Sequence, residues 1–167
     1  MEQINQQQQE WDIVRRYLEQ ATPAQWHLFA ARSNYDGNDQ PLRWLIDNPN
    51  LDRATALLIY WYLGAGWYVQ FESEQKMQSY ERETFQQLKL LEQRYSEGYY
   101  ACHNIWFDPL QSEGGRPDDY ADLVVKRPIP DLMLIAVEGT EFVDLDDDQY
   151  DDGLPMDIAE QIFALYS

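Results

Sequence analysis

Apolar residues recur with helical spacing through the first hundred residues of the chain. Trp11, Val14 and Leu18 stand three and four positions apart, so they share one face of a helix. Residues 1–9 before them are polar and rich in glutamine, and we expect that end of the helix to fray. The longest periodic stretch spans 73–96 and predicts another helix.

Start and stop signals divide the region between these two stretches into shorter helices. Thr22 and Gln25 have the spacing of a capping box, which begins one helix. Pro41 opens a second, because proline suits the first position of a helix. Asp52 caps a third, which ends at Gly64.

The last third of the chain mixes short apolar runs with loops. The runs 123–125 and 132–137 are β-prone, and prolines separate them, so we expect a small hairpin or an edge strand there. An acidic segment over 144–153 precedes a final amphipathic helix over 155–166. The pattern therefore predicts a single domain over 1–167, mainly α (α+β), with about five to six helices and a small C-terminal β-hairpin.

Composition restricts the partners of this domain. Hydrophobic residues make up 44% of the 167 positions, which is enough for a folded core. The net charge of −18 argues against direct binding of nucleic acid or of a membrane surface, since both need a basic face. Any macromolecular partner is expected to be basic.

The chain carries none of the common targeting signals. The N-terminus lacks the basic and apolar regions of a signal peptide, and the apolar stretch 54–69 is too short to span a membrane. A single cysteine, Cys102, fits a reducing compartment. We therefore expect a cytoplasmic protein; the sequence does not determine its oligomeric state.

The side chains that most often carry catalysis are few and scattered. Cys102 and His103 are neighbours, but neighbours in an extended segment point to opposite faces. His27 lies between apolar residues of a helix and is expected to flank the core. Two histidines, one cysteine and no Cys-x-x-Cys motif argue against a tetrahedral zinc site. We expect no catalytic residue, no metal and no cofactor.

The negative charge is concentrated near the C-terminus. Residues 1–100 carry 14 acidic and 9 basic side chains, a net of −5, whereas 101–167 carry 16 and 3, a net of −13. Six aspartates and one tyrosine form the candidate partner-binding site: Asp144, Asp146, Asp147, Asp148, Tyr150, Asp151 and Asp152.

Three interpretations of this segment stay open. It does not have the EF-hand pattern, because neither a start at Asp144 nor one at Asp148 places both the required glycine and the final glutamate. Another calcium or magnesium site is possible. A solvated loop that caps the last helix, or a surface that attracts a basic partner, would explain the residues equally.

A second polar loop precedes Pro41 and is a further candidate site. Its candidate residues are Asn34, Tyr35, Asp36 and Asp39. Functional residues often lie on loops of this kind. Asx-turn formation and helix capping explain the same residues without any function.

Three segments in order carry a family resemblance: WHLFAARSNYDG at 26–37, PLRWLIDNPNLD at 41–52 and ATALLIYW at 54–61. With GYY at 98–100 and NIWFDP at 104–109, they resemble the bacterial family called domain of unknown function number 4274. Leu51 departs from its pattern, in which cysteine is common, and the acidic segment is not part of it.

The resemblance implies a small helical bacterial protein with no assigned catalytic residues. Some members of the family are encoded near polymorphic toxins, which implies an immunity role. The resulting hypothesis is a non-enzymatic immunity protein whose acidic surface occludes the basic active-site cleft of a cognate secreted toxin. The alternative is a cation-binding protein or a carboxylate-dependent enzyme that uses the acidic loops.

Overall fold

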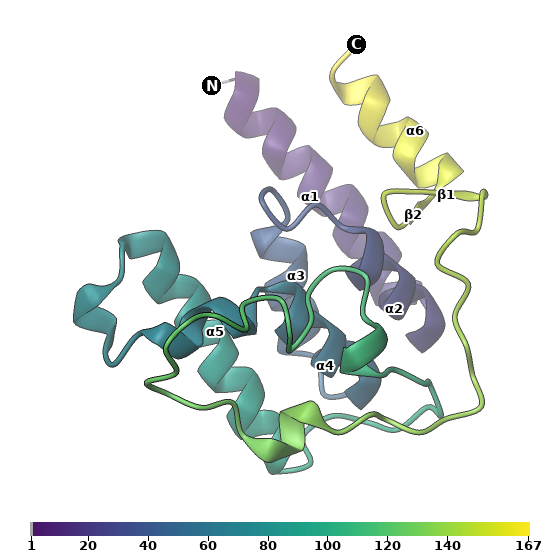
Figure 1. Ribbon diagram of the computed structural model, residues 1–167. Helices are drawn as coiled ribbons and strands as arrows, with labels where there is room; N and C mark the ends of the chain where they lie inside the picture. The colour runs from purple at the N-terminus through teal and green to yellow at the C-terminus, as the bar shows by residue number, and fades with distance from the viewer. Residues whose placement is uncertain (1) are drawn as a thin grey trace.

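Helices make up most of the computed structural model, which describes residues 2–167 (Figure 1). The α-helices are α1 (Glu2–Gln20), α2 (Pro23–Arg32), α3 (Asp39–Ile46), α4 (Arg53–Tyr62), α5 (Ser79–Ser96) and α6 (Met156–Leu165). The short 3-10 helices are η1 (Ala65–Gln70), η2 (Glu74–Lys76), η3 (Pro109–Gln111) and η4 (Asp131–Leu134). Strands β1 (Tyr150–Asp151) and β2 (Leu154–Pro155) pair antiparallel. The expectation of a mainly helical domain with a small hairpin near the C-terminus is confirmed.

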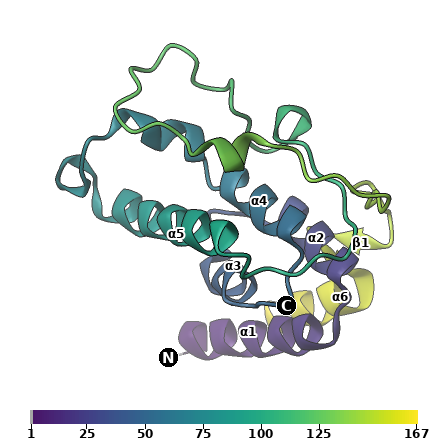
Figure 2. The same cartoon turned by 90° about the horizontal axis from the view of Figure 1, so that it is seen from below.

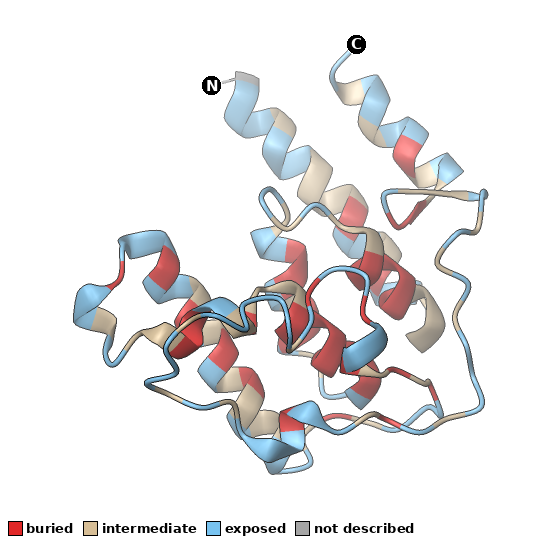
Figure 3. Ribbon diagram, in the orientation of Figure 1, coloured by how far each residue is buried: buried red, intermediate tan, exposed pale blue. Residues whose placement is uncertain are grey.

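Helix α4 is the centre of the core. Its residues from Ala54 to Trp61 are all buried, because the sequence is apolar around the whole helix. Helices α2 and α5 pack against it; α2 is buried on all sides from Trp26 to Ala31, whereas α5 buries one apolar face with Phe85, Leu88 and Leu91. The buried residues gather where these helices face one another (Figure 3).

The start of α4 also anchors an extended segment. Asp52 is buried, and its carboxylate accepts hydrogen bonds from the backbone N–H groups of Ala54, at 2.7 Å, and of His103. Arg53 N–H donates to Ala101 O at 2.8 Å, and Ala101 N–H donates to Leu51 O at 2.9 Å. The predicted cap therefore has a second role, since its carboxylate joins the helix to His103, 51 positions further along the chain.

The molecule has three layers (Figure 2). Helices α1 and α6 form one outer layer, α2 to α5 form the middle, and the long irregular connection from η3 to β1 crosses the opposite side. Helix α6 runs back along α1, so both termini lie at the same end (Figure 1). No helix within residues 2–167 has the length and apolar content needed to span a bilayer.

Two local expectations are wrong. Apart from Met1, which lies outside the described residues, the polar N-terminus is helical rather than frayed, because α6 packs along it and Gln6 Nε2 donates to Leu165 O at 3.0 Å. The run 123–125 forms no strand, and 131–134 is a 3-10 helix. In the second run only Val137 is paired, in a bridge to Phe107, so the hairpin lies at 150–155 instead.

Candidate functional site

The acidic segment 144–152 lies against the end of α2. Arg32, in the last turn of that helix, donates from Nε to Leu145 O at 2.8 Å and forms an ion pair with Asp146 at 3.0 Å. A second guanidinium nitrogen pairs with Glu113 at 2.9 Å. One arginine thus joins the acidic segment to the loop after η3.

Three of the aspartates shape the backbone of the segment. The side chain of Asp144 accepts from Asp146 N–H at 3.0 Å, and that of Asp147 accepts from Gln149 N–H at 2.9 Å; both are Asx-turns. Asp152 and Gly153 have φ of 50° and 83°, which is the conformation of a two-residue type I′ hairpin turn. These residue types therefore have a structural explanation as well as a functional one.

The turn packs directly against α2. A Cβ atom on Gly153 would lie 2.7 Å from Phe29 Cα, so this position requires glycine for its φ and for the close approach. Tyr150 is half-buried, and its hydroxyl accepts a hydrogen bond from Gln25 Nε2 at 3.1 Å. Tyr150 is thus partly engaged with the start of α2 and is less available to a partner than the sequence suggested.

Four carboxylates of the segment remain exposed: Asp144, Asp146, Asp148 and Asp152. Three of them, together with the half-buried Asp147, line a shallow hollow of about 290 Å³ whose edge includes Arg32. Over the described residues, the ion pair between Asp146 and Arg32 is the only one that the segment makes. The surface therefore keeps a strongly negative potential.

The carboxylates do not converge on one point. Among residues 2–167, no group of three His, Cys, Asp or Glu side chains has an arrangement that could hold a metal ion. The exposed carboxylates offer negative charge and hydrogen-bond acceptors along a surface.

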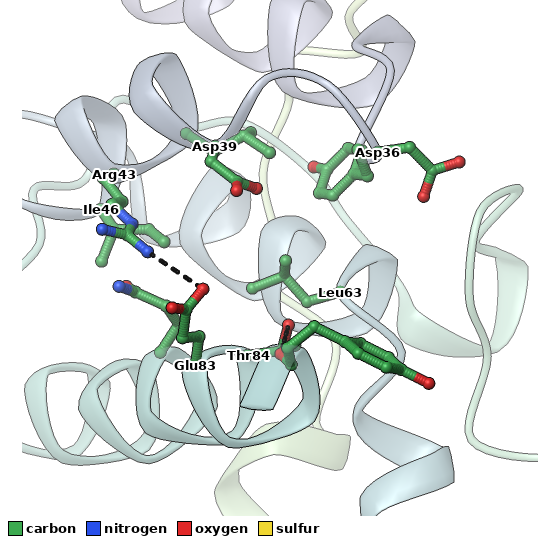
Figure 4. A pocket seen from close by; sticks show the side chains of 11 residues that line it. Asp36, Asp39, Arg43, Ile46, Leu63, Glu83 and Thr84 are labelled. Carbon is green, nitrogen blue, oxygen red and sulfur yellow. Dashed lines mark hydrogen bonds and ion pairs between the residues drawn. The ribbon is translucent and has the colours of Figure 1, made fainter. Parts of the chain in front are cut away.

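The loop 34–39 lines a cavity of about 220 Å³ between α3 and α5 (Figure 4). Asp36 and Asp39 lie on the side of the loop and α3, and Glu83 lies on the side of α5, where it pairs with Arg43 at 3.9 Å. Leu63 forms part of the floor.

The expected Asx-turn is present in this loop, since Asn34 Oδ1 accepts from Asp36 N–H at 3.0 Å. Tyr35 is half-buried, and its hydroxyl donates to Ala30 O at 2.8 Å. The structure thus brings Tyr35, Asp36 and Asp39 to one cavity, while Asn34 shapes the turn beside it.

A neighbouring cavity of about 390 Å³ was not expected from the sequence. Its walls are aromatic, and we call it the aromatic cleft: Trp67, Tyr68, Tyr80 and Tyr120, with Glu81 and Leu63. Leu63 and Tyr80 line both cavities, which are therefore adjoining. The available signal was the aromatic pair that directly follows two glycines after α4. No sequence signal pointed to Tyr120, because only the tertiary fold brings this residue to the cleft.

The remaining candidate residues occupy unremarkable positions. His27 is 4% exposed and its Nδ1 lies 2.8 Å from the Thr55 hydroxyl; burial lowers the pKa of His27 to about 4. Cys102 is exposed, and His103 Nε2 lies 2.9 Å from Asn50 O. His27 is therefore buried inside the core, whereas the sequence had led us to expect that it merely flanks the core.

Comparison with known proteins identifies the class of domain that this helical core forms. Residues 21–96 match a family model described as Domain of unknown function (DUF4274). Over these residues the chain is similar to that family. The match covers α2 to α5, and so includes the loop 34–39 and most of the aromatic cleft, whereas the acidic segment lies outside it. No curated protein and no solved structure matches the chain.

Proposed function

We propose that this protein binds a basic protein partner through its acidic segment, and that it acts as an immunity protein which neutralises a secreted bacterial toxin. The observation that carries the proposal is the set of exposed carboxylates at Asp144, Asp146, Asp148 and Asp152, for which Arg32 provides the one ion pair within residues 2–167. Such a surface attracts a basic partner and speeds the encounter.

The way the segment is held supports a binding role. Asx-turns and the hairpin turn at Gly153 hold its backbone, and that turn packs on Phe29 of the core helix α2. A preorganised surface loses little conformational entropy when a partner binds. Many toxins act on nucleic acids or nucleotides and have basic clefts, in which spaced carboxylates can take the place of phosphates.

In this proposal the protein works in the bacterial cytoplasm and acts by stoichiometric binding, without catalysis. The partner to test is the C-terminal domain of a long secreted protein encoded directly upstream. We expect its expression to arrest growth, co-expression of this chain to restore growth, and the two proteins to elute together at one-to-one stoichiometry. If the chain neither rescues growth nor forms the complex, the immunity role is wrong.

The role of the acidic segment is tested by neutralising it without changing its shape. The substitutions Asp144→Asn, Asp148→Asn and Asp152→Asn keep an acceptor for the Asx-turn and a residue that tolerates positive φ. We expect the triple variant to associate about tenfold more slowly at low ionic strength, and the difference to shrink at high salt.

The matched control removes the same three charges elsewhere, at the exposed Glu72, Glu97 and Glu138, each changed to Gln. It should change the association rate much less. Equal rates for the two triple variants in stopped-flow mixing would exclude the acidic segment from the interface.

A further inference from the structure

The aromatic cleft presents ring surfaces to solvent. Trp67, Tyr80 and Tyr120 are 38%, 63% and 40% exposed, which is high for side chains of this size. The rings of Trp67 and Tyr120 lie 5.5 Å apart between centroids, with their planes at 64°. They therefore form two walls that meet at a steep angle, as in an open aromatic cage.

Neighbouring residues hold these walls in place. Trp67 Nε1 donates to Glu81 Oε2 at 3.1 Å, and Gln78 N–H donates to Glu81 Oε1 at 3.0 Å. Gly66 leaves room for the second wall, since a Cβ atom there would lie 3.3 Å from Tyr120 Cδ2. The cleft is thus built from η1, the first turn of α5 and one tyrosine of the long connection.

The charged side chain that lines the cleft, Glu81, is acidic. The two hydrogen bonds from Gln78 and Trp67 lower the pKa of Glu81, so its carboxylate is ionised at neutral pH. The adjoining cavity adds Asp36, Asp39 and Glu83, and its arginine, Arg43, already pairs with Glu83.

We propose that the aromatic cleft binds a cationic side chain of a protein partner, an arginine guanidinium or a lysine ammonium. The faces of indole and phenol rings attract cations, and an adjacent carboxylate adds a Coulomb attraction. An anionic ligand would be repelled. Apart from Tyr120, the residues of the cleft lie in the matched region 21–96, and none of them belongs to 144–152, so the proposed surface does not depend on the acidic segment.

The test uses the protein alone with small probes. We would follow the Trp67 indole N–H signal by NMR, assigned with a Trp67→Phe variant, during titration with N-acetyl-arginine amide and N-acetyl-lysine amide. Sodium chloride at equal ionic strength and N-acetyl-glutamine amide are the controls. We expect a saturable shift with the cationic probes only, while the buried indole of Trp61, which donates to Met133 O at 2.9 Å, stays unshifted.

Variants connect the binding to the rings. Tyr120→Leu should weaken binding of the arginine probe about two- to fivefold, whereas Tyr120→Phe, which keeps the ring, should bind nearly as the wild type does. Phe142→Leu removes an exposed ring outside the cleft and should change nothing. Shifts no larger than those from sodium chloride, or equal affinity in Tyr120→Leu, would overturn the proposal, and neither result involves a toxin or the acidic segment.

Discussion

Two buried polar side chains of this protein, Asp52 and His27, each contact a partner that suits their charge state. Asp52 is buried and accepts backbone N–H groups, which suits a carboxylate. His27 is equally buried but contacts a hydroxyl and lies edge-on to the ring of Phe107, 6.4 Å away between centroids. That environment offers no negative charge to stabilise an imidazolium, so His27 is neutral in the folded protein.

This neutrality predicts a pH dependence of stability. The pKa of His27 is about 4 in the folded state and close to 6.5 in the unfolded chain, so below pH 6.5 the unfolded chain binds a proton that the folded protein does not. Between pH 7 and 5 the free energy of unfolding should fall by about 2 kcal/mol from this residue. Urea unfolding at several pH values measures the slope, and His27→Gln should flatten it. An unchanged slope in that variant would contradict the assignment.

Among the elements, the hairpin of β1 and β2 depends most on single residues. It has only two residues in each strand, so its turn and its packing on α2 hold it together. Asp-Gly at the turn is a well-known hairpin signal, but here it lies within a run of aspartates, and charge obscured it in the sequence.

Comparing two glycines distinguishes the cost of a positive φ from the cost of a steric clash. Gly153 and Gly98 have φ of 83° and 73°, but a Cβ atom would collide with Phe29 only at Gly153 and would meet nothing within 4 Å at Gly98. We expect Gly98→Ala to cost about 1 kcal/mol and Gly153→Ala to cost about 2–4 kcal/mol in the free energy of unfolding. Equal losses on urea unfolding would show that the hairpin does not press on α2.

At the scale of the whole molecule, the long connection between η3 and β1 is held to the helical core by a few contacts. Arg127 donates to Glu92 at 2.6 Å, and Tyr60 donates to the other carboxylate oxygen at 2.6 Å. Arg127 also lies over the ring of Phe85, 4.8 Å from its centroid. The backbone N–H groups of Lys126 and Arg127 both reach Val69 O.

Breaking this attachment should destabilise the protein more than breaking a surface pair. Arg127→Met leaves Glu92, whose side chain is 12% exposed, without its cation, and we expect a loss of about 1–3 kcal/mol in the free energy of unfolding. Arg116→Met is the control: it breaks an ion pair with Asp118 at 3.2 Å in which both side chains are largely exposed, and should cost less than about 0.5 kcal/mol. Similar losses for both variants would mean that Arg127 does not hold the connection.

Features that depend on residues a few positions apart were predictable from the sequence. The capping box at Thr22 is present, with Gln25 N–H donating to Thr22 Oγ1 at 3.2 Å and Thr22 N–H donating to Gln25 Oε1 at 2.9 Å. The cap of α4 was also predicted: the Asp52 carboxylate accepts a hydrogen bond from Ala54 N–H. The helix expected over 73–96 begins only at Ser79, because 74–76 forms a 3-10 turn.

The sequence by itself determined the helices, their caps and the place where negative charge is concentrated, because these depend on residues within a few positions of one another. Only the tertiary structure determines which of those carboxylates stay exposed and that the Tyr150 hydroxyl contacts Gln25 at the start of α2. It also decided that Trp67 meets Tyr120, 53 positions away, over the gap left by Gly66. These outcomes depend on packing between segments far apart in the chain, and no local pattern of residues encodes them separately.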